Sequence, residues 1–316
     1  MNKTFYSNGK LLLTGEYLVL DGALSLAIPT QFGQSLEVET IDEPKLIWES
    51  IDANGNVWFE NEFNIQDKIS RFTRNDKCVS KRLIQILRAA KQLNPNFLNS
   101  EVGYQVTTKL DFPQFWGLGS SSTLINNVAK WANVDAYQLL EQTFGGSGYD
   151  IACAQHDFPI TYRLINQDYA ISHTVRNDKK REVRELSFSP EFKDHLYFVH
   201  LNKKQNSRDG IAQYNANKNN FSLAISEISD ITSNIISCNS LKHFETLISS
   251  HEQIISKIIK QKPIKKLLFN DYKGAIKSLG AWGGDFILVT GNKSSMDYFR
   301  NKGFNTIILY TEMVLN

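Results

Sequence analysis

Short apolar runs dominate the first part of the chain. Residues 3 to 60 hold several of them, separated by turn residues, including "LLLTG", "YLVLDG" and "SLEVET". Runs of this length that end at glycine or polar residues favour strands and hairpins over helices. We therefore expect a sheet at the start of the chain.

Helical and strand patterns alternate through the rest of the chain. Apolar residues between 79 and 90 recur at the spacing of one helix face, and residues 102 to 106 alternate like a half-buried strand. Residues 159 to about 200 again indicate strands, and the mixed charge run 176–185 predicts a solvated hairpin. Two helical periods, over 225–235 and 244–258, then precede the apolar runs "DFILVTG" and "TIILY". Both halves therefore predict helices packed on a sheet.

Length and charge narrow the class of protein. A chain of 316 residues is long for one core and suits two domains. Its 41% hydrophobic and 22% charged residues are typical of a globular protein. A net charge of +2 gives no field that would attract nucleic acid or an acidic membrane, so we expect neither as a partner.

Cysteine usage and the first residues indicate the compartment. The three cysteines are far apart in the sequence and show no metal-binding spacing, which predicts free thiols in a reducing environment. "MNKTFYSNGK" lacks the apolar core of a signal peptide, and no run approaches the roughly 18 apolar residues of a membrane span. We expect a cytoplasmic protein, with its oligomeric state left open.

The stretch "FWGLGSSSTLINNVAKW", residues 115–131, holds the first candidate chemistry. Gly117 and Gly119 let a ligand approach the backbone, and three serines follow at the start of an apolar helix. A helix N-terminus attracts anions, and hydroxyl groups there can bind phosphate or magnesium. The alternative is that the serines only cap the helix, and this stretch alone leaves both interpretations open. No Walker loop, GxGxxG or GxSxG pattern fits these residues.

Four segments together resemble one family. "GKLLLTGEYLVLDG" (9–22), "PQFWGLGSSST" (113–123) and "KSLGAWGGDF" (277–286) resemble, in order, the three signature motifs of the GHMP kinases. This group includes the galactokinases, homoserine kinases, mevalonate kinases and phosphomevalonate kinases. "GGSGYDIACAQ" (145–155) resembles the segment that holds the catalytic aspartate in the mevalonate branch, and its GYDIA string resembles a bacterial subgroup of that name.

The resemblance implies an α+β fold with two domains. Residues 1–190 would form an N-terminal domain similar to the second domain of ribosomal protein S5. Residues 191–316 would form a ferredoxin-like C-terminal domain that begins just before the strand "HLYFVHL". ATP and the acceptor would meet in the cleft between the two domains.

The same resemblance implies roles for individual residues. ATP and Mg²⁺ are the implied cofactors, and Ser121 is similar to the magnesium-binding serine. Asp150 matches the aspartate that takes the proton of the acceptor hydroxyl, and Lys10 matches the lysine near that aspartate and the transferred phosphate. The loop that wraps the ATP phosphates matches Gly117, Leu118, Gly119, Ser120, Ser121 and Ser122.

Further residues are implied at the acceptor and the metal. The glycine loop beside the substrate corresponds to Gly280, Gly283 and Gly284, and Glu16 and Tyr17 belong to the first motif on the substrate side. Glu141 is a candidate for an acidic magnesium ligand, although its position also fits a surface carboxylate of a helix.

The implied activity is that of an ATP-dependent kinase acting on mevalonate or phosphomevalonate, in isoprenoid precursor synthesis. GEY and GSGYD resemble the phosphomevalonate kinase version of the motifs. Trp116 and Trp282 stand where the family carries small residues, which opens the alternative of a non-catalytic GHMP-fold protein that binds a nucleotide or metabolite. A decarboxylase similar to diphosphomevalonate decarboxylase, which also uses ATP, is another alternative within the family.

Overall fold

The computed structural model describes most of the chain, and this part divides into two compact units. The described residues are 2–64, 70–72, 77–99, 102–165, 180–205, 207–216 and 221–315. The first unit comprises Met1–Gly9, Phe32–Gln114 and Leu118–Gln155, and the second comprises Lys10–Gln31, Phe115–Gly117 and His156–Asn316. Neither unit is one continuous segment, whereas domains 1–190 and 191–316 would be. The boundary near residue 190 stays a prediction.

A mixed sheet forms one side of the first unit. Its strands are β2 (Ser25–Ile41), β3 (Lys45–Ile51), β4 (Val57–Asn64), β5 (Ser70–Phe72) and β6 (Gly103–Leu110), and β1 (Lys3–Leu12) pairs with β2. The order is β5-β4-β3-β6-β2, in which β3 and β6 run parallel and the other neighbours run antiparallel. The predicted strand over residues 102–106 is confirmed as part of β6.

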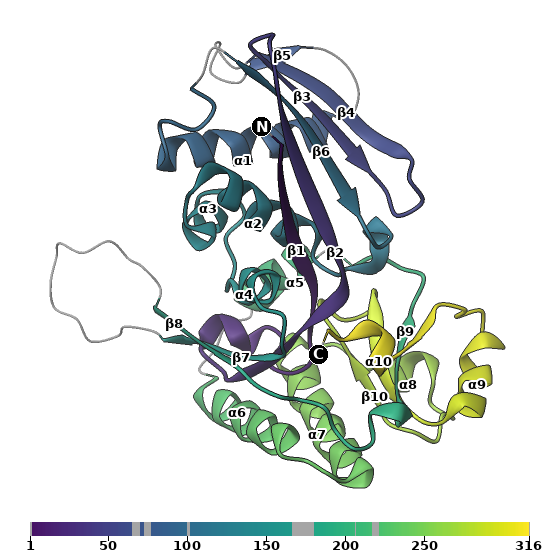
Figure 1. Ribbon diagram of the computed structural model, residues 1–316. Coiled ribbons are helices and arrows are strands. Elements are labelled where there is room, and N and C mark those ends of the chain that lie inside the picture. The colour runs from purple at the N-terminus through teal and green to yellow at the C-terminus, as the bar shows by residue number, and fades with distance from the viewer. Residues whose placement is uncertain are drawn as a thin grey trace, which may run out of the picture. The chain divides into compact units, whose positions relative to one another are not determined.

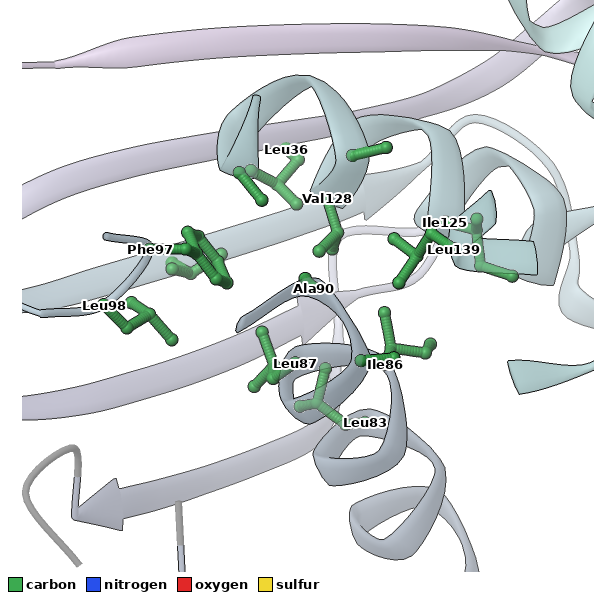
Figure 2. Packing of buried hydrophobic residues seen from close by; sticks show 14 of the residues in the cluster. Leu36, Leu83, Ile86, Leu87, Ala90, Phe97, Leu98, Ile125, Val128 and Leu139 are labelled. Atoms are coloured by element: carbon green, nitrogen blue, oxygen red, sulfur yellow. The ribbon is translucent and has the colours of Figure 1, made fainter. Parts of the chain in front are cut away.

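Helices cover one face of this sheet (Figure 1), and side chains from the sheet and the helices together form the buried hydrophobic cluster of the unit. The helices are α1 (Lys77–Leu93), α2 (Ser120–Ala132), α3 (Ala136–Thr143) and α4 (Tyr149–Gln155). The predicted helical face over residues 79–90 is confirmed, because Leu83, Ile86 and Leu87 point into the buried cluster (Figure 2). Ile125 and Val128 of α2 pack in the same cluster, so the helix that starts at the serines is anchored by its apolar face.

The second unit contains two sets of strands. Residues 25–27 of β2 pair with β7 (Ile160–Ile165), which pairs with β8 (Lys180–Glu185). The predicted hairpin over 176–185 is described only from residue 180 onward, where it forms β8. An antiparallel sheet of order β10-β11-β9-β12 contains β9 (Leu196–His200), β10 (Ile276–Ser278), β11 (Phe286–Thr290) and β12 (Ile307–Leu309).

The second unit contains both of the helices that the sequence predicts beyond residue 220. The period over 225–235 lies in α6 (Ser222–Ile236), and the period over 244–258 lies in α7 (Leu241–Ile259). The others are α5 (Ser207–Ala216), α8 (Ile264–Leu268), α9 (Asp297–Arg300) and α10 (Tyr310–Met313). This mixture of sheets and helices confirms the α+β class. None of the helices in the described ranges has the length and apolarity to cross a membrane.

One predicted strand is wrong. In "YLVLDG", residues Leu18–Asp21 form a short 3-10 helix, η1, and not a strand. Leu18 and Val19 are buried, and Gly22 ends the turn with a φ of 92°. A short apolar run fits a buried turn of helix as well as a buried strand, so its length could not separate the two.

Candidate active site

The glycine and serine loop ends in an open helix N-terminus. Gly119 precedes α2 with a φ of 92° and Gly117 has a φ of 69°, a backbone region that favours glycine. In the first unit, Thr123 Oγ1 donates to Gln34 Oε1 at 2.7 Å, which ties the first turn of α2 to β2. The helix start is therefore held in place, and its first amide groups are of the kind that bind anions.

The three serines differ in their surroundings. Ser122 is buried, and its Oγ donates to the carbonyl oxygen of Gly119 at 2.8 Å instead of accepting from a helix amide. Ser120 is half-buried and Ser121 is exposed. The exposed hydroxyl of Ser121 is accessible to a ligand, and its role in binding stays a prediction.

Asp150 lies in the first turn of α4, in the same unit as the serines. It is half-buried and follows Gly148, whose φ is 90°. Asn126 of α2 donates to the carbonyl oxygen of Ala154 at 3.2 Å and accepts from Gln155 Nε2 at 3.0 Å. These bonds fix α4 against α2, so packed helices carry both the predicted base and the predicted phosphate loop.

Lys10 lies in the second unit and contacts the glycine loop. Its Nζ donates to the carbonyl oxygen of Gly117 at 2.9 Å, although the two residues are far apart in the sequence. The structure thus brings together the first and second motifs at one ammonium group. Asp150 and the three serines belong to the first unit, and this hydrogen bond does not include them.

Asp285 is a candidate that the sequence analysis missed. A β-carbon on Gly117 would lie 2.4 Å from Asp285 Cγ, so the carboxyl group touches the glycine loop. Burial raises the pKa of Asp285, and the backbone amide of Gln205 and the positive charge of Lys10 oppose that rise. The available signal was its position directly after Gly284 in the third motif.

A hydrogen bond from a histidine and an aromatic contact, both within the second unit, hold the turn before Gly117. His200 Nε2 donates to the carbonyl oxygen of Phe115 at 3.3 Å, because His200 Nδ1 accepts from the backbone amide of Asn202. The ring of Trp116 packs edge-on against Phe286 with 5.4 Å between the centroids. Trp116 therefore supports the turn from the protein side.

Trp282 lies in the core of the second unit. It is 1% exposed and packs in an apolar cluster with Tyr17, Tyr214 and neighbouring aliphatic residues. Among the described atoms, its Nε1 has no hydrogen-bond partner. Trp282 stands where the GHMP kinases carry a small residue, and its indole fills the interior of the second unit.

The two predicted substrate-side segments contact each other. Tyr17 has a φ of 64°, and its hydroxyl donates to the carbonyl oxygen of Ala281 at 2.9 Å. Glu16 is 1% exposed and forms an ion pair with Lys277 of the third motif. A β-carbon on Gly284 would lie 2.7 Å from the carbonyl oxygen of Lys203, and Gly280 and Gly283 have positive φ angles.

No protein-built metal centre is found in the described ranges. Within them, no group of three or more His, Cys, Asp or Glu side chains could hold a metal ion. Glu141 lies on the exposed side of α3, and its role as a magnesium ligand stays a prediction. The donors present fit a magnesium ion that keeps several waters and is held mainly by nucleotide phosphates, with the Ser121 hydroxyl as the protein ligand.

Comparison with known proteins finds relatives by structure. No family model and no curated protein sequence matches the chain. A mevalonate kinase from Methanococcus jannaschii is 15% identical, over 98% of this chain and 97% of that one, with a TM-score of 0.67. The Streptococcus pneumoniae phosphomevalonate kinase is 16% identical, over 96% and 95% of the two chains, with a TM-score of 0.64.

A third solved structure extends the likeness beyond the mevalonate kinases. The Lactococcus lactis galactokinase is 13% identical, over 95% of this chain and 88% of that one, with a TM-score of 0.65. All three relatives are GHMP kinases. At these identities the likeness concerns the fold, which is therefore that of the GHMP kinases, as the sequence motifs predict.

Proposed function

We propose that this chain is an ATP-dependent kinase of a small hydroxylated acid. The observation that carries the proposal is the hydrogen bond from Lys10 to Gly117. It joins a lysine of the first motif to the glycine loop of the second, directly before the open N-terminus of α2. A cation, flexible glycines and free helix amides are the groups that phosphoryl transfer requires.

The phosphates of ATP would bind at the start of α2. The backbone amides of residues 118–122 and the hydroxyl of Ser120 would bind phosphate oxygens, and Lys10 would add a positive charge. Ser121 would ligate Mg²⁺, which neutralises the charge of the transferred phosphoryl group when it is bound. Ser122 would keep the loop in shape through its bond to Gly119.

Asp150 would accept the proton of the acceptor hydroxyl. Phosphoryl transfer depends on positioning and charge neutralisation more than on covalent help, so one carboxylate is sufficient as a base. Asp150 fits this role because it is only half-buried, and because the bonds between α4 and α2 fix the helix that carries it.

The acceptor we favour is mevalonate or phosphomevalonate, in the cytoplasm. GEY and GSGYD support phosphomevalonate. Lys203 and Lys204 are exposed close in sequence to Gln205, whose backbone amide donates to Asp285. Such side chains suit a phosphate already present on the acceptor. The alternative of a protein that only binds nucleotide rested on Trp116 and Trp282, and both indoles pack against protein.

An ADP-release panel tests the proposal. The purified chain is incubated with Mg-ATP and, separately, with mevalonate, phosphomevalonate, diphosphomevalonate, homoserine and galactose. We expect release with mevalonate or phosphomevalonate, and release slower by roughly 10² or more from the Asp150→Asn protein prepared in parallel, which controls for contaminating kinases. ADP release in the absence of any acceptor would contradict the proposal. So would the absence of ADP release with all five acceptors.

A further inference from the structure

Four titratable side chains form a buried cluster in the second unit. Glu16 follows the end of β1, His251 and Glu252 lie on α7, and Lys277 lies on β10. Each of the four side chains is at most 5% exposed. Lys277 pairs with Glu16, and its Nζ also lies 3.6 Å from Glu252 Oε1. One ammonium group therefore faces two carboxyl groups.

The imidazole adds no positive charge to this cluster. His251 Nε2 accepts a hydrogen bond from the backbone amide of Gly15 at 2.9 Å, which requires this nitrogen to be unprotonated. Burial, and then the charge of Lys277, hold the pKa of His251 well below its usual range. The 3.3 Å contact between His251 Nε2 and Glu16 Oε2 is therefore not an ion pair. With both carboxyls ionised, the cluster would carry one uncompensated negative charge.

A buried negative charge without a partner is costly, so the cluster favours one bound proton. Burial raises the pKa of Glu16, and Lys277 opposes that rise. Burial also raises the pKa of Glu252 to about 7, although Lys277 and the bonds from Ser278 oppose it. Glu16 Oε2 has no hydrogen-bond partner within the described part of the chain, so a negative charge on this carboxyl is poorly compensated at that oxygen. The proton belongs to the pair of carboxyls.

The cluster also connects two segments of the candidate site. Gly15 is bonded to His251, and Glu16 is paired with Lys277. Lys277 Nζ donates to the carbonyl oxygen of Ser278 at 2.6 Å, and Ser278 donates to both oxygens of Glu252. The turn 15–17 and the segment 278–281 are thus held through the same buried groups. The titratable groups that the turn, α7 and β10 place against the carboxyls are Tyr17, His251 and Lys277.

We propose that Glu16, Glu252 and Lys277 are positioning residues that share one proton and hold the turn 15–17 against the segment 278–281. Gain or loss of this proton changes how Lys277 is divided between the two carboxylates, and so changes the geometry of both segments. Acceptor binding then depends on pH through groups that do not touch the acceptor. This last consequence rests on the proposed function.

The first test needs no activity. The amide signal of Gly15 is followed by ¹H–¹⁵N NMR in the wild type and in Glu252→Gln between about pH 5.5 and 8.5, a window centred near the pKa of Glu252. We expect Gly15 to titrate near neutrality in the wild type and to lose this titration in Glu252→Gln. Glu245→Gln, on the same helix but outside the cluster, should titrate like the wild type. Glu16→Gln is the second variant, expected to lose the titration as well.

The second test measures acceptor binding. Across the same pH range, the KM for the acceptor should vary with pH differently in the wild type and in Glu252→Gln, while the pH dependence of the KM for ATP is the same in both. A Gly15 signal that does not titrate in the wild type, or titrates unchanged in both cluster variants, overturns the proposal. Loss of the titration in these variants supports it even where no acceptor is phosphorylated, because that outcome contradicts only the proposed function.

Discussion

The candidate groups of the two units are built in different ways. In the first unit, Ser121 and Asp150 stand in the first turns of two helices, partly exposed, and the helices are fixed by packing and amide bonds. In the second unit, Glu16 and Lys277 are buried and paired with each other. The first arrangement leaves chemical groups accessible to a ligand, and the second uses charges to hold backbone segments. Substitutions of Ser121 and Asp150 should therefore alter activity, and substitutions of Glu16 and Lys277 should alter stability.

The largest expected effect is a loss of folding stability when Lys277 is replaced. Lys277→Met leaves Glu16 and Glu252 without their cation, and removing one partner of a buried pair costs about 3–5 kcal/mol. We expect the free energy of unfolding, measured in urea, to fall by this amount at pH 8, and by less at pH 5, where the carboxyls can take up protons.

A matched lysine of the first unit provides the control. Lys130 is exposed and donates to the carbonyl oxygen of Tyr6 at 3.0 Å, so Lys130→Met should cost about 1 kcal/mol or less. Equal losses in the two variants would show that the buried cluster contributes no more than a surface contact.

The second prediction concerns the pH dependence of stability. Folding raises the pKa of Glu252 from its ordinary value of 4.5 to about 7, so the folded chain binds this proton more tightly than the unfolded chain. The resulting stabilisation is complete below about pH 4.5 and is lost as the pH rises through 7. It amounts to about 3 kcal/mol, at about 1.4 kcal/mol per pH unit.

Unfolding experiments from pH 5 to pH 8.5 measure this contribution. Glu252→Gln carries the uncharged form permanently, so its stability should decline less than that of the wild type over this range. Parallel curves for the two proteins would place the titrating group elsewhere.

The third prediction concerns Asp150, where we expect a loss of activity without a loss of stability. Asp150→Asn should lower turnover by roughly 10² or more, the range for loss of a general base, while the midpoint of unfolding and Mg-ATP binding stay close to the wild type. The measurements are steady-state kinetics and calorimetric titration with an ATP analogue. Asp157→Asn, an exposed aspartate just beyond α4, is the control and should turn over normally. Near-normal turnover of Asp150→Asn would remove it from the mechanism.

The smallest effects should separate two neighbouring serines. Ser121→Ala should weaken Mg-ATP binding with little change in stability, because its hydroxyl is exposed. Ser122→Ala should cost about 1 kcal/mol of stability, since it loses the bond to Gly119, and should leave ATP affinity nearly unchanged. Affinity and unfolding are measured on both proteins. Equal effects on ATP affinity would favour a purely structural role for both serines.

Local patterns predicted the helices well and one short segment wrongly. The helices over 79–90, 225–235 and 244–258 were predicted because several turns of apolar spacing specify one buried face. Residues 18–21 were assigned to a strand because a four-residue apolar run carries no period. What decides its conformation is the turn of Tyr17 and Gly22 on either side, which depends on contacts such as that of Tyr17 with Ala281.

By itself, the sequence determined the GHMP kinase fold and named Lys10, Ser121 and Asp150 as candidates, because motifs in a fixed order are visible without coordinates. Only the tertiary structure decided the partners of the charges. Glu16 meets Lys277, Glu252 competes for the same ammonium group, and Asp285 touches Gly117, each across a long stretch of chain. The energy of a charge depends on its burial and on the charges within a few ångströms. Both are set when distant segments pack together, and no local pattern of residues specifies them.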